Sequence, residues 1–271
     1  MKYIFLLLIC SVTAFAQTTI IPIETEHNAL LLQTDAQNRL RTVYFGERLA
    51  DVKGYNDVTR QFHYDDENAG IHNSVYTPSG TWNLVEPAIQ VKHADGNVSL
   101  ELKYASHHKR EVDVNTTLTS VVLKDPLYPF QVTLFYKVWK KENVIEQWTE
   151  IQHTEKKPVE LQKYASANLY FHAKDFYLTT YQGEWAKEMQ PAETKLERGI
   201  RSIDSKLGTR AMLLQSPNFI VSMGGAASEN NGTVIVGQLA WSGNFKLEFD
   251  VDVYKNLRVI AGINPYASAY S

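Results

Sequence analysis

Apolar and polar residues alternate along most of the chain, which is the spacing of a β-strand with one buried face. The clearest example is residues 245–253, where every second residue is apolar and the residues between them are charged. Alternation of this kind places one set of side chains on each face of a strand. We therefore predict a strand with one buried face and one solvent-exposed, charged face. Further strands are predicted at residues 89–93, 99–104, 131–138, 144–152, 233–239 and 257–263.

The segments between these strands carry short turn sequences. Asp95-Gly96-Asn97 separates residues 89–93 from residues 99–104, and Asn231-Gly232 precedes residues 233–239. Asp-Gly and Asn-Gly favour tight hairpins, and strands joined by short turns pair antiparallel. No sustained apolar period of 3.6 residues is present, which argues against βαβ folds and helical bundles. The pattern predicts an all-β fold, a sandwich of two large antiparallel sheets.

Residues 1–16 have the layout of an export signal. Met1-Lys2 supplies a basic start, residues 3–12 are almost wholly apolar, and Ala14-Phe15-Ala16 matches a cleavage site. The apolar stretch is short for a membrane span. We predict cleavage before Gln17, a mature domain of residues 17–271, no membrane association after cleavage, and a periplasmic or secreted product. Cys10 is the only cysteine, so the mature chain would have neither disulfides nor a thiol nucleophile.

Composition and charge narrow the function classes. The 27 Lys and Arg residues against 30 Asp and Glu residues give a formal net charge of −3, which supplies no electrostatic footprint for nucleic acid. The eight histidines show no metal-binding spacing, so we predict no metal site and no cofactor. No carboxylate or nucleophile motif stands out, and no catalytic residue is assigned. Although a glycosidase pair is not excluded by counting carboxylates, none is recognisable.

The irregular stretch of residues 46–82 is where a β scaffold would place functional loops. Tryptophans there and elsewhere either stack on sugar rings or fill the core. Trp139 and Trp148 lie inside predicted strands, which favours packing. Trp82 and Trp185 lie beside glycines in turn-like sequence, where both roles stay open.

Several motifs together resemble the N-terminal region of the family 36 glycoside hydrolases, which are α-galactosidases and relatives acting on raffinose-type sugars. The motifs are L-R-T-V-Y-F-G at 40–46, E-P-A-I at 86–89, H-A-D-G-N at 93–97, Y-Q-G-E-W-A-K-E at 181–188, G-Q-L-A-W-S-G-N-F at 237–245 and R-V-I-A-G-I-N at 258–264. The resemblance implies a large antiparallel β-supersandwich of the galactose-mutarotase-like type. In that family a (β/α)₈ barrel follows and carries both catalytic aspartates; its "K-W-D" motif is absent from this sequence.

The resemblance also implies a role for one loop. Many family members carry a Gly-Asp-Phe-Arg stretch before the E-P-A motif that reaches an active site, sometimes that of a neighbouring subunit. Here residues 80–85 read G-T-W-N-L-V, so Trp82 and Asn83 would supply the sugar contact instead.

Three hypotheses follow. In the first, the chain is the non-catalytic domain of an exported α-galactosidase, inactive alone, that supports a barrel binding α-galactoside oligosaccharides and assists homo-oligomer assembly. In the second it is a free-standing carbohydrate-binding module, and in the third a complete enzyme whose carboxylates are unrecognised.

Overall fold

The structure of the chain is a computed structural model that describes residues 18–59, 65–66, 70–80, 83–211 and 213–266. The predicted signal segment, residues 1–16, and Trp82 lie outside the described residues. Strands dominate, and every pairing between them in the described residues is antiparallel, as the turn sequences predicted. No helix in the described part of the chain is long and apolar enough to cross a membrane.

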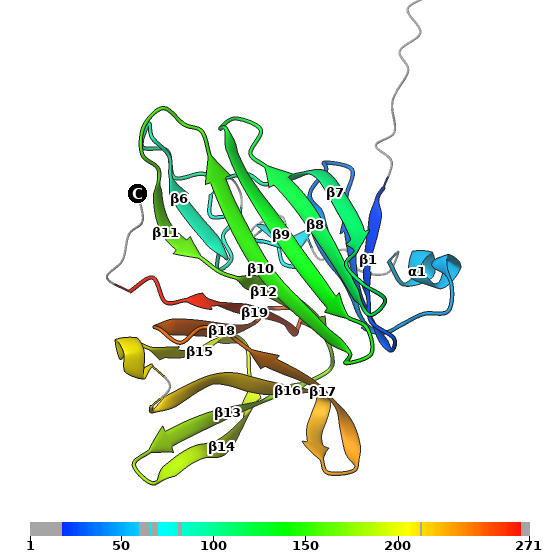
Figure 1. Cartoon of the computed structure of the whole chain (residues 1–271), viewed down its shortest axis with the longest axis vertical. Coiled ribbons are helices and arrows are strands. Elements are labelled where there is room, and N and C mark those ends of the chain that lie inside the picture. Colours follow the sequence, from blue (N-terminus) through cyan, green and yellow to red (C-terminus); the bar gives the residue numbers. More distant parts are fainter. Residues whose placement is uncertain (1–17, 60–64, 67–69, 81–82, 212, 267–271) are drawn as a thin grey trace, which may run out of the picture.

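The upper half of Figure 1 contains a large sheet in the order β10-β9-β8-β7, and a three-stranded sheet in the order β1-β2-β3. A two-stranded sheet of β6 and β11 completes this half. The strands are β1 (Ile20–Glu24), β2 (Asn28–Thr34), β3 (Leu40–Glu47), β6 (Ile89–Lys92), β7 (Lys103–Glu111), β8 (Thr116–Lys124), β9 (Phe130–Trp139), β10 (Val144–His153) and β11 (Glu160–Tyr164). Together they enclose the first hydrophobic core, which includes Val91, Val132 and Leu134.

Two further sheets form the lower half of Figure 1. The middle sheet has the order β12-β19-β18-β15, and the outer sheet has the order β14-β13-β16-β17. Their strands are β12 (Ala167–His172), β13 (Phe176–Glu184), β14 (Lys187–Leu196), β15 (Gly199–Ser205), β16 (Gln215–Ser228), β17 (Asn231–Gln238), β18 (Phe245–Val251) and β19 (Asn256–Ile263). A second core containing Phe176, Phe219 and Phe249 fills the space between these sheets.

The middle sheet is buried on both faces. The apolar residues of β18, such as Leu247 and Phe249, face the second core, while Ile260 of β19 belongs to the first core. The predicted strand is therefore confirmed from Phe245 to Val251, whereas Val253 lies in the following turn and is exposed. The predicted solvent-exposed charged face is wrong. Glu248 is buried, because the upper half of the molecule covers this face. The fold is the predicted antiparallel β-supersandwich, with two cores sharing one central sheet.

A short helix, α1 (Val52–Thr59), lies within the stretch that the sequence marked as irregular. Asp51 caps it by accepting a hydrogen bond from the N–H of Gly54 at 2.7 Å. Tyr55 packs on Ala29 and Leu31 of β2. Burial and the hydrogen bond from the Tyr55 hydroxyl to Glu24 raise the pKa of Tyr55 to about 12. The remaining elements are a 3₁₀ turn at Gly208–Arg210, β4 (Asp65–Asp66) and β5 (Gly70–Ile71).

The hairpin predicted between residues 89–93 and 99–104 is wrong. The turn itself exists, because the N–H of Gly96 donates to the carbonyl of His93 at 2.8 Å. However, β6 pairs with β11, and the next strand begins only at Lys103 and pairs with β8. The chain between them runs beside Ser79 instead, where Leu100 donates its N–H to the Ser79 carbonyl at 3.0 Å.

Candidate functional site

The loop that the sequence singled out is held by a close turn. Asn83 donates its N–H to the Gly80 carbonyl at 3.1 Å, and its side-chain oxygen accepts the N–H of Ile71 at 3.2 Å. Gly80 has a φ of +99°, and a Cβ there would lie 2.4 Å from the Cα of Ser99, so only glycine fits. Asn83 thus uses its amide oxygen within the fold. A sugar contact by Trp82 and Asn83 stays a prediction.

The segment leading into this turn is buried rather than exposed. Asn73, Tyr76 and Thr77 have at most 1% of their surface exposed. The Tyr76 hydroxyl donates to the Ala165 carbonyl at 2.7 Å, and burial raises the pKa of Tyr76. The Asn73 amide donates to the Thr42 carbonyl at 3.0 Å. Residues 71–78 therefore form a buried strap that fixes the base of the loop, although the sequence offered no periodicity there.

A nearly buried ion pair supports the same strap from the β2–β3 side. Arg41 is 2% exposed and lies 2.7 Å from the Asp35 carboxylate, which also binds Arg39 at 2.7 Å. Desolvation would raise the pKa of Asp35, but hydrogen bonds from the Arg39 backbone and from both arginine side chains lower it overall. Arg41 also points a guanidinium nitrogen at the Asn73 side-chain oxygen, 3.4 Å away. The strap is thereby tied to a carboxylate that stays ionised.

The other end of the strap is held by the charged face of the middle sheet. Arg258 of β19 has no exposed side-chain surface and is paired with Asp250 of β18. Its guanidinium also donates to the Glu86 carbonyl at 2.9 Å and lies 3.4 Å from the Thr77 hydroxyl. One buried arginine therefore connects the middle sheet to both sides of the loop that carries Asn83.

A lysine-centred cluster continues this network. The Lys163 ammonium on β11 pairs with the carboxylate of Glu86 and with that of Glu248, the latter at 2.5 Å. Glu248 in turn binds Lys246 at 2.5 Å. These carboxylates are thus neutralised by fixed cations, an arrangement that suits structural support more than proton transfer. In the part of the chain that the structure describes, no group of three or more His, Cys, Asp or Glu residues is placed to hold a metal ion.

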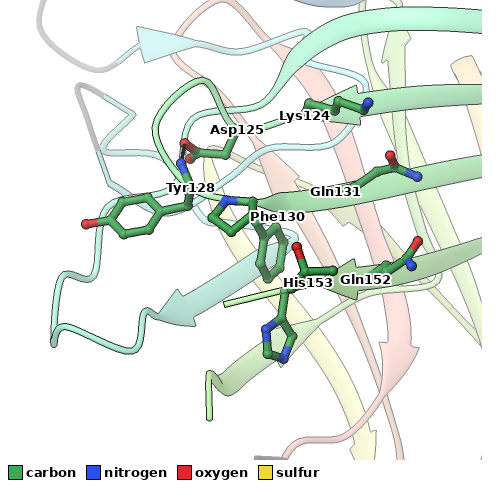
Figure 2. Close-up of a pocket in the computed structure, with 9 residues that line it drawn as sticks. Lys124, Asp125, Tyr128, Phe130, Gln131, Gln152 and His153 are labelled. Atoms are coloured by element: carbon green, nitrogen blue, oxygen red, sulfur yellow. Dashed lines mark hydrogen bonds between the residues drawn. The ribbon is translucent and has the colours of Figure 1, made fainter. Parts of the chain in front are cut away.

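A cavity of about 280 Å³ lies at one end of the large sheet (Figure 2). Gln131 and Gln152 lie opposite each other on β9 and β10 and line it together with His153, Lys124 and Tyr128 among others. Asp125 also lines it, but its carboxylate accepts the N–H groups of residues 101, 127 and 128 and so shapes the loop. The amides, imidazole and ammonium are groups that bind hydroxyls. No sequence pattern marks this cavity, because its residues come from separate strand ends.

A buried histidine, His93, lies behind Tyr128 at this cavity, and the sequence analysis assigned it no role. His93 has a fully buried ring, pairs through Nδ1 with Glu155 at 2.7 Å, and stacks on Tyr128 with ring centroids 3.7 Å apart. Tyr128 in turn donates to Asp95 at 2.8 Å. The H-A-D-G-N motif is therefore a structural corner that fixes one wall of the cavity.

Trp139 and Trp148 lie in strands as predicted, but they belong to none of the hydrophobic cores that the described residues form. Trp185 is 93% exposed at the tip of the β13–β14 hairpin. Trp148 stacks on Phe135 with centroids 4.9 Å apart, and Lys137 lies 4.2 Å above the ring of Trp139. The faces of Trp139 and Trp148 are thus engaged within the chain, on the partly exposed side of the large sheet.

Comparison with known proteins identifies the family. Residues 38–271 match the model described as the glycosyl hydrolase family 36 N-terminal domain. The chain belongs to this family. The α-galactosidase AgaA of Geobacillus stearothermophilus is 25% identical over 87% of this chain, and α-galactosidase Mel36A of Lactobacillus acidophilus is 25% identical over 92%. The chain spans 35% and 37% of the length of these two relatives.

The solved structures agree at the level of fold. The crystal structure of a G. stearothermophilus AgaA variant in complex with raffinose superposes with a TM-score of 0.84 at 22% identity. It covers 93% of this chain, whereas the chain covers 38% of that protein. The similarity therefore confirms the predicted supersandwich fold. This family 36 domain corresponds in length to 38% of the chain in that structure.

The G-Q-L-A-W-S-G-N-F motif has a structural explanation in this family 36 domain. Trp241 donates its indole N–H to the Asn244 carbonyl at 3.0 Å, and the Asn244 side chain accepts the Gly208 N–H at 2.7 Å. Gly237 lies opposite Phe219, and a Cβ there would be 2.1 Å from the Phe219 ring. Phe219 packs edge-on against Phe249 at 5.1 Å and is fixed in the core. The motif thus builds the β17–β18 corner.

We expect Gly237→Ala to lower the free energy of unfolding by about 1–3 kcal/mol, because the buried Phe219 ring has no room to move. Urea denaturation measures the change. Gly225→Ala on β16 is the matched control, since nothing lies within 4 Å of a Cβ built there. Equal effects of the two substitutions would show that Phe219 does adapt.

Proposed function

We propose that this chain is the non-catalytic N-terminal domain of an exported α-galactosidase that hydrolyses terminal α-D-galactosides in oligosaccharides. The observation that carries the proposal is the family match over residues 38–271, combined with coverage of only 35% of the α-galactosidase AgaA. The domain supports a catalytic barrel encoded beyond this sequence. The layout of residues 1–16 supports export to the periplasm or the medium.

The buried network gives the domain a specific task within that enzyme. Arg258 and Lys163 hold Glu86, and the strap of residues 71–78 is tied on both sides, so the turn at residues 80–83 has a rigid base. Rigid support is what a loop needs in order to add substrate contacts to a neighbouring active site. Trp82 and Asn83 are the residues proposed to reach the sugar.

A second candidate function is a free-standing carbohydrate-binding module. The cavity in Figure 2 favours it, because Gln131, Gln152 and His153 offer side-chain hydrogen bonds beside the aromatic Tyr128. Sugar sites in proteins combine such polar groups with an aromatic surface.

Titration calorimetry of the purified chain with raffinose distinguishes the two functions. The proposed role as an accessory domain predicts no saturable binding by the isolated chain, because its loop would contribute only part of a site. Saturable binding that is lost in Gln152→Ala would instead establish the module. His107→Ala, an exposed change on β7, is the control that should leave any such binding intact.

A further inference from the structure

Strand β17 leaves one edge of the outer sheet open. In the described residues it pairs only with β16, and it lies at the lower right of Figure 1. Its residues 231–234 are exposed, and Val236 is 71% exposed. The strand reads N-G-T-V-I-V-G-Q, with no charged residue and no proline. Strand β17 therefore exposes apolar side chains next to the backbone N–H and C=O groups of its open edge.

Two other edge strands in the described part of the chain carry residues that oppose pairing. Strand β14, the opposite edge of the same sheet, contains Pro191 and several charged residues, and β7 contains a run of basic and acidic residues. Charges and proline on an edge strand oppose association with another strand. Because β17 contains neither charged residues nor proline, nothing in its sequence opposes pairing with another strand.

The backbone of β17 is oriented for pairing on that side. Leu239 donates its N–H to the Pro217 carbonyl at 3.2 Å, so the bonded pairs with β16 are those of odd-numbered β17 residues, such as Gly237 with Phe219. In an antiparallel pair the alternate residues direct their N–H and C=O groups away. Val234 and Val236 therefore present their backbone groups to the open edge.

The sequence of β17 is self-complementary about Ile235. A two-fold axis through this residue places Val234 opposite Val236 of a second copy, and Val236 opposite Val234 of that copy. Both members of each pair direct their backbone groups outward, so each pair exchanges two hydrogen bonds. We propose that a second copy of this chain docks here, through antiparallel β17–β17 pairing centred on Ile235.

The side chains fit the same register. Val234 and Val236 are 44% and 71% exposed and project from the same face, so they would pack against each other across the axis. Apolar cross-strand pairs of β-branched residues add to the main-chain bonds. An interface of this kind is isologous and closes at two subunits, joining two outer sheets into one continuous sheet.

Single-cysteine cross-linking tests the register. In a Cys10→Ser background, Ile235→Cys would place two sulfurs across a non-hydrogen-bonded pair, whose Cα atoms are about 4.5 Å apart and within disulfide range. Thr233→Cys would leave its Cα atoms roughly 13 Å apart along the strands. Mild oxidation is expected to link the first variant and not the second, while thermal melts confirm that both are folded. A folded Ile235→Cys chain that stays unlinked, or equal linking of both variants, would overturn the proposal.

Sedimentation velocity tests the association itself. The wild-type chain is expected to shift from monomer to dimer across the micromolar range, and Val236→Lys to remain monomeric. Val114→Lys is the matched control, because Val114 is 90% exposed in the β7–β8 turn and should leave the dimer intact. A wild-type chain that stays monomeric, or a Val236→Lys chain that still dimerises, would contradict β17 pairing and favour a strand from another protein as the occupant.

Discussion

The purified chain is expected to hydrolyse an aryl α-galactoside at least several powers of ten more slowly than family 36 α-galactosidases do. A retaining mechanism needs two carboxyl groups about 5 Å apart across the scissile bond, one of them free to act as a nucleophile. The resemblance to the family places both in the barrel. In the described residues, the buried carboxylate of Glu248 and the partly buried carboxylates of Asp250 and Glu86 are paired with cations. Loss of the catalytic groups costs rate on this scale.

A continuous assay of released aryl alcohol measures this activity. Glu86→Gln and Glu248→Gln serve as controls for contaminating enzyme, because a trace contaminant would be unaffected by either substitution. Turnover at ordinary enzyme rates that disappears when one carboxylate is changed would establish that the chain is itself a complete enzyme.

The second large effect is expected from Asp250→Asn, which should lower the free energy of unfolding by about 3–5 kcal/mol. Asparagine keeps the shape of the side chain but removes the charge that faces Arg258. The Arg258 guanidinium has no exposed surface and would be left without a counter-charge. Urea denaturation of the variant and the parent chain measures the difference.

Glu184→Gln is the matched control for this substitution. Glu184 pairs with Lys187 at 2.9 Å, and both side chains are more than 60% exposed, so the loss should be below about 1 kcal/mol. Hydrogen exchange adds a local readout, since Arg258 also binds the Glu86 carbonyl. Asp250→Asn should therefore speed exchange of the amides around residues 77–86. Equal stability losses in Asp250→Asn and Glu184→Gln would show that the Arg258 pair is no more important than a surface pair.

Local sequence patterns predicted strands well, because alternation records which face of a strand is buried. The segment from Phe245 and the antiparallel pairing are found as predicted. The same pattern could not show that Glu248 and Arg258 are buried. Their burial comes from the β6–β11 sheet and the strap of residues 71–78, which pack on the middle sheet from elsewhere in the chain.

The mispredicted elements have the same physical origin. Asp95-Gly96 does form a turn, but β6 finds its partner in β11, about seventy residues later, and turn chemistry carries no information on such distant pairing. Helix α1 has one buried apolar side chain, Tyr55, among its described positions, which is too few to give a period. At the candidate site, the turn-like sequence beside Gly80 located the turn near Asn83, but the arginines that anchor it are recognisable only in three dimensions.

The most direct measurement is made on the product of the complete coding sequence, expressed with its own N-terminus. Intact mass and α-galactosidase activity are determined on the exported protein. The proposed function predicts a chain that begins at Gln17, extends beyond Ser271 and releases galactose from raffinose. A product that ends at Ser271, binds raffinose saturably and releases no galactose would contradict it and establish a carbohydrate-binding module.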